Sequence, residues 1–175
     1  LYMVPSPAQY VYLKTQIDDI GDFRGITVRG ADKNTVDIVS SLGMDGIAMP
    51  WGELLPALAS GRVSGVATSA SSGVDGKFWE FLSHIYPTNH TWGSNAVTIN
   101  LESWSRLTPE QQAAIEKVAA ELEPQFWESS LESDKNSIEI MTGHGMRLVE
   151  LSDELKAQIA EKAKQVQAEF FSRVP

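Results

Sequence analysis

The sequence predicts an α/β fold with a short, mostly parallel sheet flanked by helices. Three short apolar runs have the composition of buried strands, namely Ile26–Val28, Ile47–Met49 and Val63–Ala67. Two segments of helix length, residues 31–42 and 52–59, separate these runs. A β-α-β-α-β order is typical of parallel strands that are joined by crossover helices.

The two segments between the predicted strands have the apolar spacing of helices that pack on a sheet. In residues 31–42 the apolar positions recur at helical spacing, and Gly43 follows where a helix commonly ends. In residues 52–59 the leucines face one side, and Pro56 comes early enough for its missing N–H to cost little. The apolar positions of the two helices are Val36, Val39, Leu42, Leu54, Leu55 and Leu58.

The segments around these elements are less regular. Residues 1–24 begin with a proline-rich stretch, and Ile17–Phe23 is interpreted as a short helix or turn before the first strand. Residues 69–80 are predicted to form a polar loop that turns into a helix. After Pro87, residues 91–100 alternate loosely, which favours an extended strand.

The last third of the chain is predicted to contain two long helices. Thr108–Gln111 combine a capping residue, a proline and a glutamine in the order that starts a helix with a capping box. Pro124 is expected to kink or interrupt this helix, and Gly143 to end it. A short strand at residues 146–149 then leads to a final helix that is capped near Ser152.

The composition narrows the class of protein. The 175 residues carry 23 acidic and 14 basic side chains, so nucleic acid and anionic membrane surfaces are not expected as partners. The chain has no cysteine, which excludes disulfides, thiolate nucleophiles and cysteine-ligated metals. It begins at Leu1 with no recognisable signal peptide. We therefore expect that processing removed an upstream segment or that this is part of a longer chain.

Three residues at the ends of the predicted strands are candidates for ligand binding. Arg29, Trp51 and Thr68 each follow one of the three strands. In open α/β sheets, ligands bind in the crevice beyond the carboxyl ends of the strands, so these side chains are expected to converge there. A guanidinium can hold a carboxylate through two parallel hydrogen bonds. The sequence therefore predicts a site for a small carboxylate, and the alternative for Arg29 is a structural ion pair with Asp32 or another local acid.

Several residues near this crevice have both a ligand-binding and a structural interpretation. Trp51 and Trp92 could each stack on a ligand or belong to the core. Ser69 could donate a hydrogen bond to a ligand, whereas Ser71 and Ser72 are expected to cap the helix that follows.

Catalysis and metal binding have little support in the sequence. A hydrolase built from Ser69, Asp75 and His84 lacks the Gly-x-Ser-x-Gly turn that presents a serine nucleophile. His84 and His90 have neither the spacing nor the acidic neighbours of a metal site. No enzymatic activity, cofactor or metal is therefore predicted.

From about Gln16 onward, an ordered series of short motifs matches one family of transport receptors. The motifs are Asp22–Arg29, Leu42–Gly43, Met49–Leu54, Ala57–Gly65, Phe78–Glu80 and Leu107–Glu110. Each motif is weak alone, but their order and spacing are specific. On these residues the chain resembles the substrate-binding proteins of TRAP transporters, the DctP-like periplasmic solute receptors.

The resemblance implies a lobe like those of periplasmic binding proteins, with the first lobe of the receptor largely absent from this chain. Residues 1–94 and 131–175 would form the second ligand-binding lobe. Residues 95–130 would form a strand-helix excursion that belongs to the first lobe or to the hinge.

The resemblance also implies roles for individual residues. Arg29 would pair with the ligand carboxylate, while Trp51 and Thr68 would contact the ligand. Two departures affect the choice of ligand: Ser64 replaces the usual aspartate, and Thr68–Ala70 replaces a stretch that commonly reads QEN. The anchoring arginine is kept, so a small organic acid is expected, and the tryptophans favour one less polar than a sialic acid.

The expected function is the capture of an organic acid in the periplasm for the membrane permease subunits of a TRAP transporter. The alternatives are an extracellular sensor domain of the same fold, a serine-type hydrolase, and a helical interaction module built on residues 108–172. Because the excursion leaves a strand unpaired, self-association or strand swapping is expected unless a missing N-terminal lobe covers it.

Overall fold

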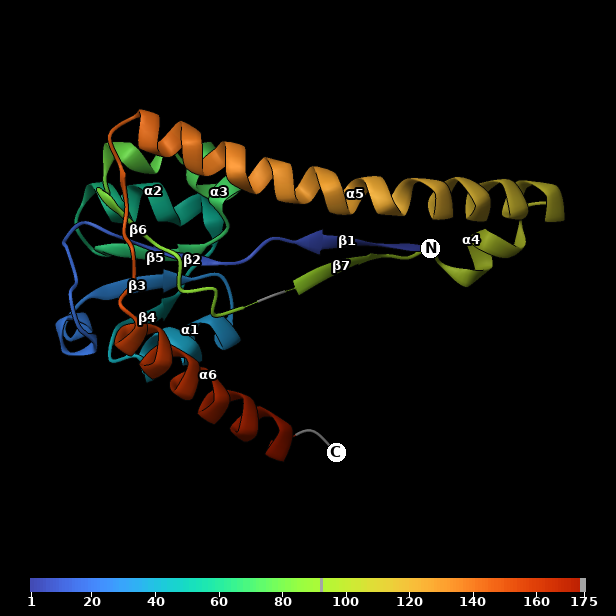
Figure 1. The fold of residues 1–175 in the computed structure, drawn as a ribbon. Coiled ribbons are helices and arrows are strands. Elements are labelled where there is room, and N and C mark those ends of the chain that lie inside the picture. Colours follow the sequence, from blue (N-terminus) through green and yellow to red (C-terminus); the bar gives the residue numbers. More distant parts are fainter. Residues whose placement is uncertain (92, 174–175) are drawn as a thin grey trace.

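A computed structural model describes residues 1–91 and 93–173, and its centre is a six-stranded sheet (Figure 1). The strand order is β4-β3-β5-β2-β6-β8. β2 is antiparallel to both of its neighbours, whereas the other pairs of this sheet are parallel, which confirms the predicted mostly parallel sheet. The strands are β2 (Tyr10–Leu13), β3 (Thr27–Gly30), β4 (Asp45–Ala48), β5 (Gly65–Thr68), β6 (His84–Tyr86) and β8 (Arg147–Leu148).

Helices cover both faces of this sheet, as Figure 1 shows. α1 (Lys33–Ser41) and α6 (Asp153–Arg173) lie on one face, while α2 (Trp51–Ala59), α3 (Ala70–Asp75) and the end of α5 (Pro109–Gly143) lie on the other. Each face therefore has its own hydrophobic core. This arrangement buries the inner strands β2, β3 and β5 on both sides, which explains why their sequences are apolar without alternation.

The sequence analysis assigned no strand to Tyr10–Leu13, although this segment is a central strand of the sheet. Its four residues are all buried. Tyr10 and Tyr12 pack in the core beneath α2 and α3, whereas Val11 and Leu13 pack in the core beneath α1 and α6. The segment was missed because it has no crossover helix beside it and pairs only with strands that come later in the chain.

A second part of the chain extends away from the sheet as an arm (Figure 1). The arm consists of a two-stranded antiparallel ribbon of β1 (Tyr2–Ser6) and β7 (Gly93–Val97), the short helix α4 (Leu101–Ser105) and the first part of α5. The expected extended strand within residues 91–100 is present as β7, but the expectation that it is unpaired is wrong, because β1 pairs with it along its whole length. Several apolar side chains of this arm are exposed, namely Ile99, Leu101, Val118, Leu122, Trp127 and Leu131.

Helix α5 begins as predicted and then continues further than predicted. The Thr108 side chain accepts a hydrogen bond from the Gln111 backbone, and the Gln111 side chain accepts one from the Thr108 backbone. The expected interruption at Pro124 is wrong, because one helix runs from Pro109 to Gly143. Pro124 lies on the exposed side of the helix, where water can satisfy the carbonyl that its missing N–H leaves free.

Two 3-10 helices complete the fold. η1 (Ile20–Phe23) fulfils the prediction of a short helix or turn before the first crossover unit, and Asp19 caps it. η2 (Phe78–Glu80) follows α3 and places the Phe78 ring in the core. Among the helices of the described ranges, none combines the length and the apolar character that crossing a membrane requires.

Candidate ligand-binding crevice

The carboxyl ends of β3, β4 and β5 lie next to one another at the edge of the sheet from which the arm extends. Arg29 pairs in register with Ile47 of β4 and with Val66 of β5. The structure places Arg29 inside β3 and Thr68 at the last position of β5, rather than just past these strands. Trp51 is the first residue of α2. The three predicted residues are thus brought to one edge of the sheet.

Arg29 is a buried cation without an acidic partner. Its side chain is 4% exposed, and its Nε donates a hydrogen bond of 2.9 Å to the backbone oxygen of Met49. Within residues 1–91 and 93–173, its two terminal nitrogens have no hydrogen-bond partner and the guanidinium makes no ion pair. The alternative of an ion pair with Asp32 is wrong, because the Asp32 carboxylate accepts a hydrogen bond from the Thr35 backbone and caps α1.

The electrostatics of Arg29 favour an anion that comes from outside the chain. Burial lowers the pKa of Arg29, and the charge of Asp32 opposes that shift. An arginine nevertheless stays protonated, because its pKa starts far above neutral pH. A buried charge without a partner raises the free energy of the folded protein. A ligand carboxylate beside the guanidinium would lower it.

Trp51 lies exposed at the start of α2, beside Arg29, rather than in the core. Its side chain is 42% exposed, and the Arg29 guanidinium carbon lies 5.9 Å from the centre of its ring. That separation is typical of a cation–π contact. The ring also lies 6.3 Å from the ring of Phe78, which in turn packs edge-on against Tyr12. The crevice therefore has an aromatic side that can contact the apolar part of a ligand.

Of the four hydroxyl residues of β5 and α3, one has a hydroxyl without a hydrogen-bond partner in the described structure, and three have hydroxyls that contact one another. Thr68 is 9% exposed, and its hydroxyl has no hydrogen-bond partner within the described ranges. Ser69 is the N-cap of α3: it accepts a hydrogen bond from the Ser72 backbone and lies close to the hydroxyls of Ser71 and Ser72. Capping was expected of Ser71 and Ser72, but Ser69 performs it. Trp92, the remaining candidate, lies outside the described residues.

A polar pair that the sequence analysis missed lies beside Thr68. Tyr10 faces Thr68 in the register of β2 and β5, and its hydroxyl donates a hydrogen bond of 2.6 Å to Asp134 of α5. Burial raises the pKa of Asp134, and the hydrogen bond from Tyr10 opposes this shift. No motif could have revealed the pair, because its members are 124 positions apart. The pair connects the crevice to the helix that forms much of the arm.

The three residues of the hydrolase alternative do not form a catalytic site. Ser69 follows the carboxyl end of β5, whereas His84 starts β6. Both strands are antiparallel to β2, so they run in the same direction and place Ser69 and His84 at opposite ends of the sheet. The hydroxyl of Ser69 is also engaged in capping α3.

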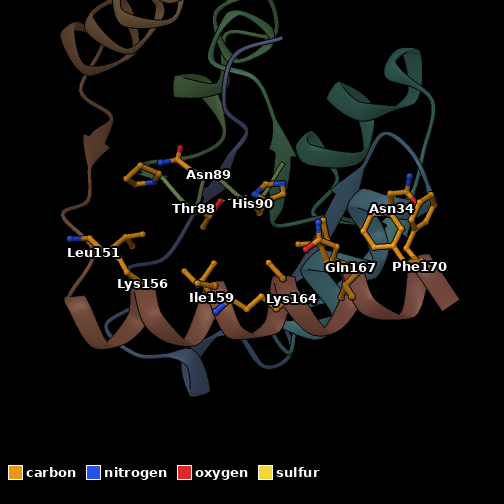
Figure 2. Close-up of a pocket in the computed structure, with 16 residues that line it drawn as sticks. Asn34, Thr88, Asn89, His90, Leu151, Lys156, Ile159, Lys164, Gln167 and Phe170 are labelled. Carbon is orange, nitrogen blue, oxygen red and sulfur yellow. Dashed lines mark hydrogen bonds between the residues drawn. The ribbon is translucent and has the colours of Figure 1, made fainter. Parts of the chain in front are cut away.

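A separate cavity of about 780 Å³ lies on the other face of the sheet, between α6, the start of α1 and residues 87–90. Figure 2 shows Thr88, Asn89 and His90 facing α6 across this cavity. His90 is 8% exposed, and its Nδ1 lies 2.7 Å from the Thr88 hydroxyl. Burial lowers the pKa of His90 to about 4, so its imidazole is neutral at pH 7.

Comparison with known proteins relates this architecture to one family. Residues 8–174 match the DctP family, described as bacterial extracellular solute-binding protein, family 7. An uncharacterised protein of Haemophilus influenzae is 21% identical over 159 residues, which is 90% of this chain and 48% of that protein. The chain thus spans about half the length of this curated relative.

Two solved structures combine the same fold with somewhat higher identity. DctP6 of Bordetella pertussis, an extracytoplasmic solute receptor binding pyroglutamic acid, is 27% identical with a TM-score of 0.91. A TRAP solute binding protein from a marine metagenome, specific for pyroglutamate, is 28% identical with a TM-score of 0.88. Each match covers 99% of this chain and 57% of the other.

Proposed function

The chain belongs to the DctP family of bacterial extracellular solute-binding proteins, and we propose that it is about half of a receptor that captures a small organic acid for a TRAP transporter. The observation that carries this proposal is the buried Arg29 guanidinium, which has no acid of its own within the described residues and lies beside Trp51 at the strand ends. Family members are extracytoplasmic receptors, and we assign this protein to the periplasm on that basis.

The proposed ligand is a compact carboxylate with an apolar ring or chain, of the size of pyroglutamate. Its carboxylate would bind the terminal nitrogens of Arg29, and its apolar part would contact the Trp51 ring. Thr68 would donate or accept a hydrogen bond at the rim. Support comes from the aromatic side of the crevice and from the two pyroglutamate receptors that are 27% and 28% identical to this chain.

The proposed division of the chain follows from the arm. Most of residues 1–94, together with residues 131–175, would form one lobe of the receptor. Residues 95–130 would join the other lobe or the hinge, and β1 would go with them because it pairs with β7. The exposed apolar side chains of the arm and the relatives' greater length both support this division. Ligand capture would close the two lobes around the acid, and the closed receptor would dock on the membrane permease subunits.

Residues 1–175 produced alone would bind ligand weakly, because only one side of the cleft is present. The ribbon of β1 and β7 and the exposed apolar residues of the arm would also favour self-association. Size-exclusion chromatography with light scattering should therefore show dimers or larger species. A clean monomer at micromolar concentration would contradict this part of the proposal.

The carboxylate role of Arg29 is tested in the complete receptor by calorimetry with L-pyroglutamate and other small acids. Arg29→Ala should weaken binding by roughly 100-fold or more, because it removes the only proposed counter-charge of a desolvated carboxylate. Arg29→Lys should recover part of this loss, since it restores the charge but not the planar fork. Arg24→Ala, at an exposed arginine that precedes β3, is the control and should bind as the wild type does. Unchanged binding by Arg29→Ala would refute the site.

A further inference from the structure

Helix α2 begins without a side-chain cap, directly beside Arg29. Its N-cap is Pro50, which has no side-chain acceptor. The N–H of Glu53 bonds to the Pro50 oxygen. The N–H groups of Trp51 and Gly52 have no hydrogen-bond partner in the part of the chain that the structure describes. Free N–H groups at the start of a helix attract anions, because the helix dipole adds to their hydrogen-bonding capacity.

The position of Arg29 shows that this helix start belongs to the crevice. The Nε of Arg29 bonds to the oxygen of Met49, the residue just before the cap, and its guanidinium carbon lies 5.9 Å from the Trp51 ring. Arg29 is 96% buried, and its terminal nitrogens have no partner among the described residues. Two independent sets of donors, one charged and one from the backbone, therefore lack acceptors in the same place.

Gly52 leaves the approach to these N–H groups open. A Cβ added at Gly52 would have no atom within 4 Å, and both Trp51 and Gly52 are exposed. The neighbouring α1 starts differently, because the Asp32 carboxylate caps it. Glu53 is the acid in the first turn of α2, and its carboxylate makes no hydrogen bond to the Trp51 or Gly52 N–H in the described structure.

We infer that the first turn of α2 is the second half of the carboxylate site: one ligand oxygen accepts from the N–H groups of Trp51 and Gly52 while the guanidinium of Arg29 binds the anion from the side. The inference rests on the proposed function. It makes the ligand carboxylate the missing cap of α2. It also explains why this helix can start at a proline, since an acidic N-cap would compete with the ligand for the same donors.

The inference is tested by substitutions at Pro50 that give α2 an N-cap side chain of its own. In the complete receptor, Pro50→Asn supplies a neutral capping side chain, Pro50→Asp supplies a capping side chain with a charge, and Pro50→Ala is the matched control without a cap. Both capped variants should melt higher than Pro50→Ala in the absence of ligand, by roughly 2–4 °C. Affinity for L-pyroglutamate should nevertheless fall relative to Pro50→Ala, about fivefold for Pro50→Asn and about 100-fold for Pro50→Asp.

Capped variants that bind as tightly as Pro50→Ala, with or without a higher melting temperature, overturn the inference. If Arg29→Ala loses binding in the same experiment, the proposed function survives that result. A wild-type receptor that binds none of the small carboxylates would contradict both the inference and the proposed function.

Discussion

Arg29 and His90 are two basic residues buried near the carboxyl ends of the parallel strands, on opposite faces of the sheet. They differ in whether the buried side chain keeps its charge. His90 is neutral and its ring lies against the Thr88 hydroxyl, next to a cavity of about 780 Å³. Arg29 cannot lose its proton near neutral pH, and its terminal nitrogens have no partner in the described structure. The cavity therefore lies beside a neutral ring, whose Nδ1 has a partner in Thr88 and whose Nε2 has none in the described structure. An unsatisfied cation, rather than the volume of a cavity, points to the place where a ligand belongs.

The neutral state of His90 gives the largest expected effect on stability. Its pKa in the folded protein is about 4, below the value of about 6.5 in an unfolded chain. The unfolded state therefore takes up the proton first as the pH falls. The stability that His90 contributes is complete above about pH 6.5 and is lost progressively as the pH falls towards 4.

His90→Asn offers an oxygen near the position of Nδ1 but cannot be protonated. Between pH 7 and pH 4, the wild type should lose on the order of 3 kcal/mol more stability than this variant, as measured by urea unfolding at a series of pH values. Parallel curves for the two proteins would mean that the pKa of His90 is the same in the folded and unfolded states, and the contrast with Arg29 would fail.

Replacing Trp51 tests whether the ligand binds beside Arg29 rather than beside His90. Trp51→Ala should weaken L-pyroglutamate binding by about tenfold or more in the complete receptor, because it removes both the ring contact and the cation–π support of Arg29. Asn34→Ala, at the rim of the other cavity, should leave affinity unchanged. Equal losses in the two variants would contradict binding of the ligand beside Trp51.

The elements with a local signal were predictable, and those that depend on distant parts of the chain were not. The two crossover helices, the capping box of α5 and the strand-end position of Arg29 are all encoded within a few neighbouring residues. β2 could not be predicted in the same way, because it pairs with β5 and β6, which come more than 50 residues later. The continuity of α5 through Pro124 depends on which side of the helix the proline faces.

The site shows the same division. That Arg29, Trp51 and Thr68 lie together at the carboxyl ends of the strands was predictable from the strand-end rule, while their role in binding stays a prediction. Whether Arg29 is paired was not, because that depends on Asp32 being used as a helix cap. The free N–H groups of α2 also required the structure, since a proline at the start of a helix is common and carries no signal for a ligand.

The smallest expected effect concerns the hydrogen bond between Tyr10 and Asp134, which ties the crevice to α5. Tyr10→Phe should lower the free energy of unfolding at pH 7 by about 1–2 kcal/mol, because the Asp134 carboxylate then loses its donor in a partly buried position. Asp134→Asn keeps an acceptor for the Tyr10 hydroxyl and removes the charge.

Burial raises the pKa of Asp134 above that of an unfolded chain, so its contribution to stability is complete at pH values below the unfolded pKa and is lost as the pH rises through the folded value. Asp134→Asn should therefore be at least as stable as wild type at pH 7 and less stable relative to it at pH 4. Urea unfolding at both pH values measures this crossover. If Tyr10→Phe were neutral and Asp134→Asn destabilising at pH 7, the charge of Asp134 would be supported by a group other than Tyr10. The hydrogen bond between Tyr10 and Asp134 would then not stabilise the contact between β2 and α5.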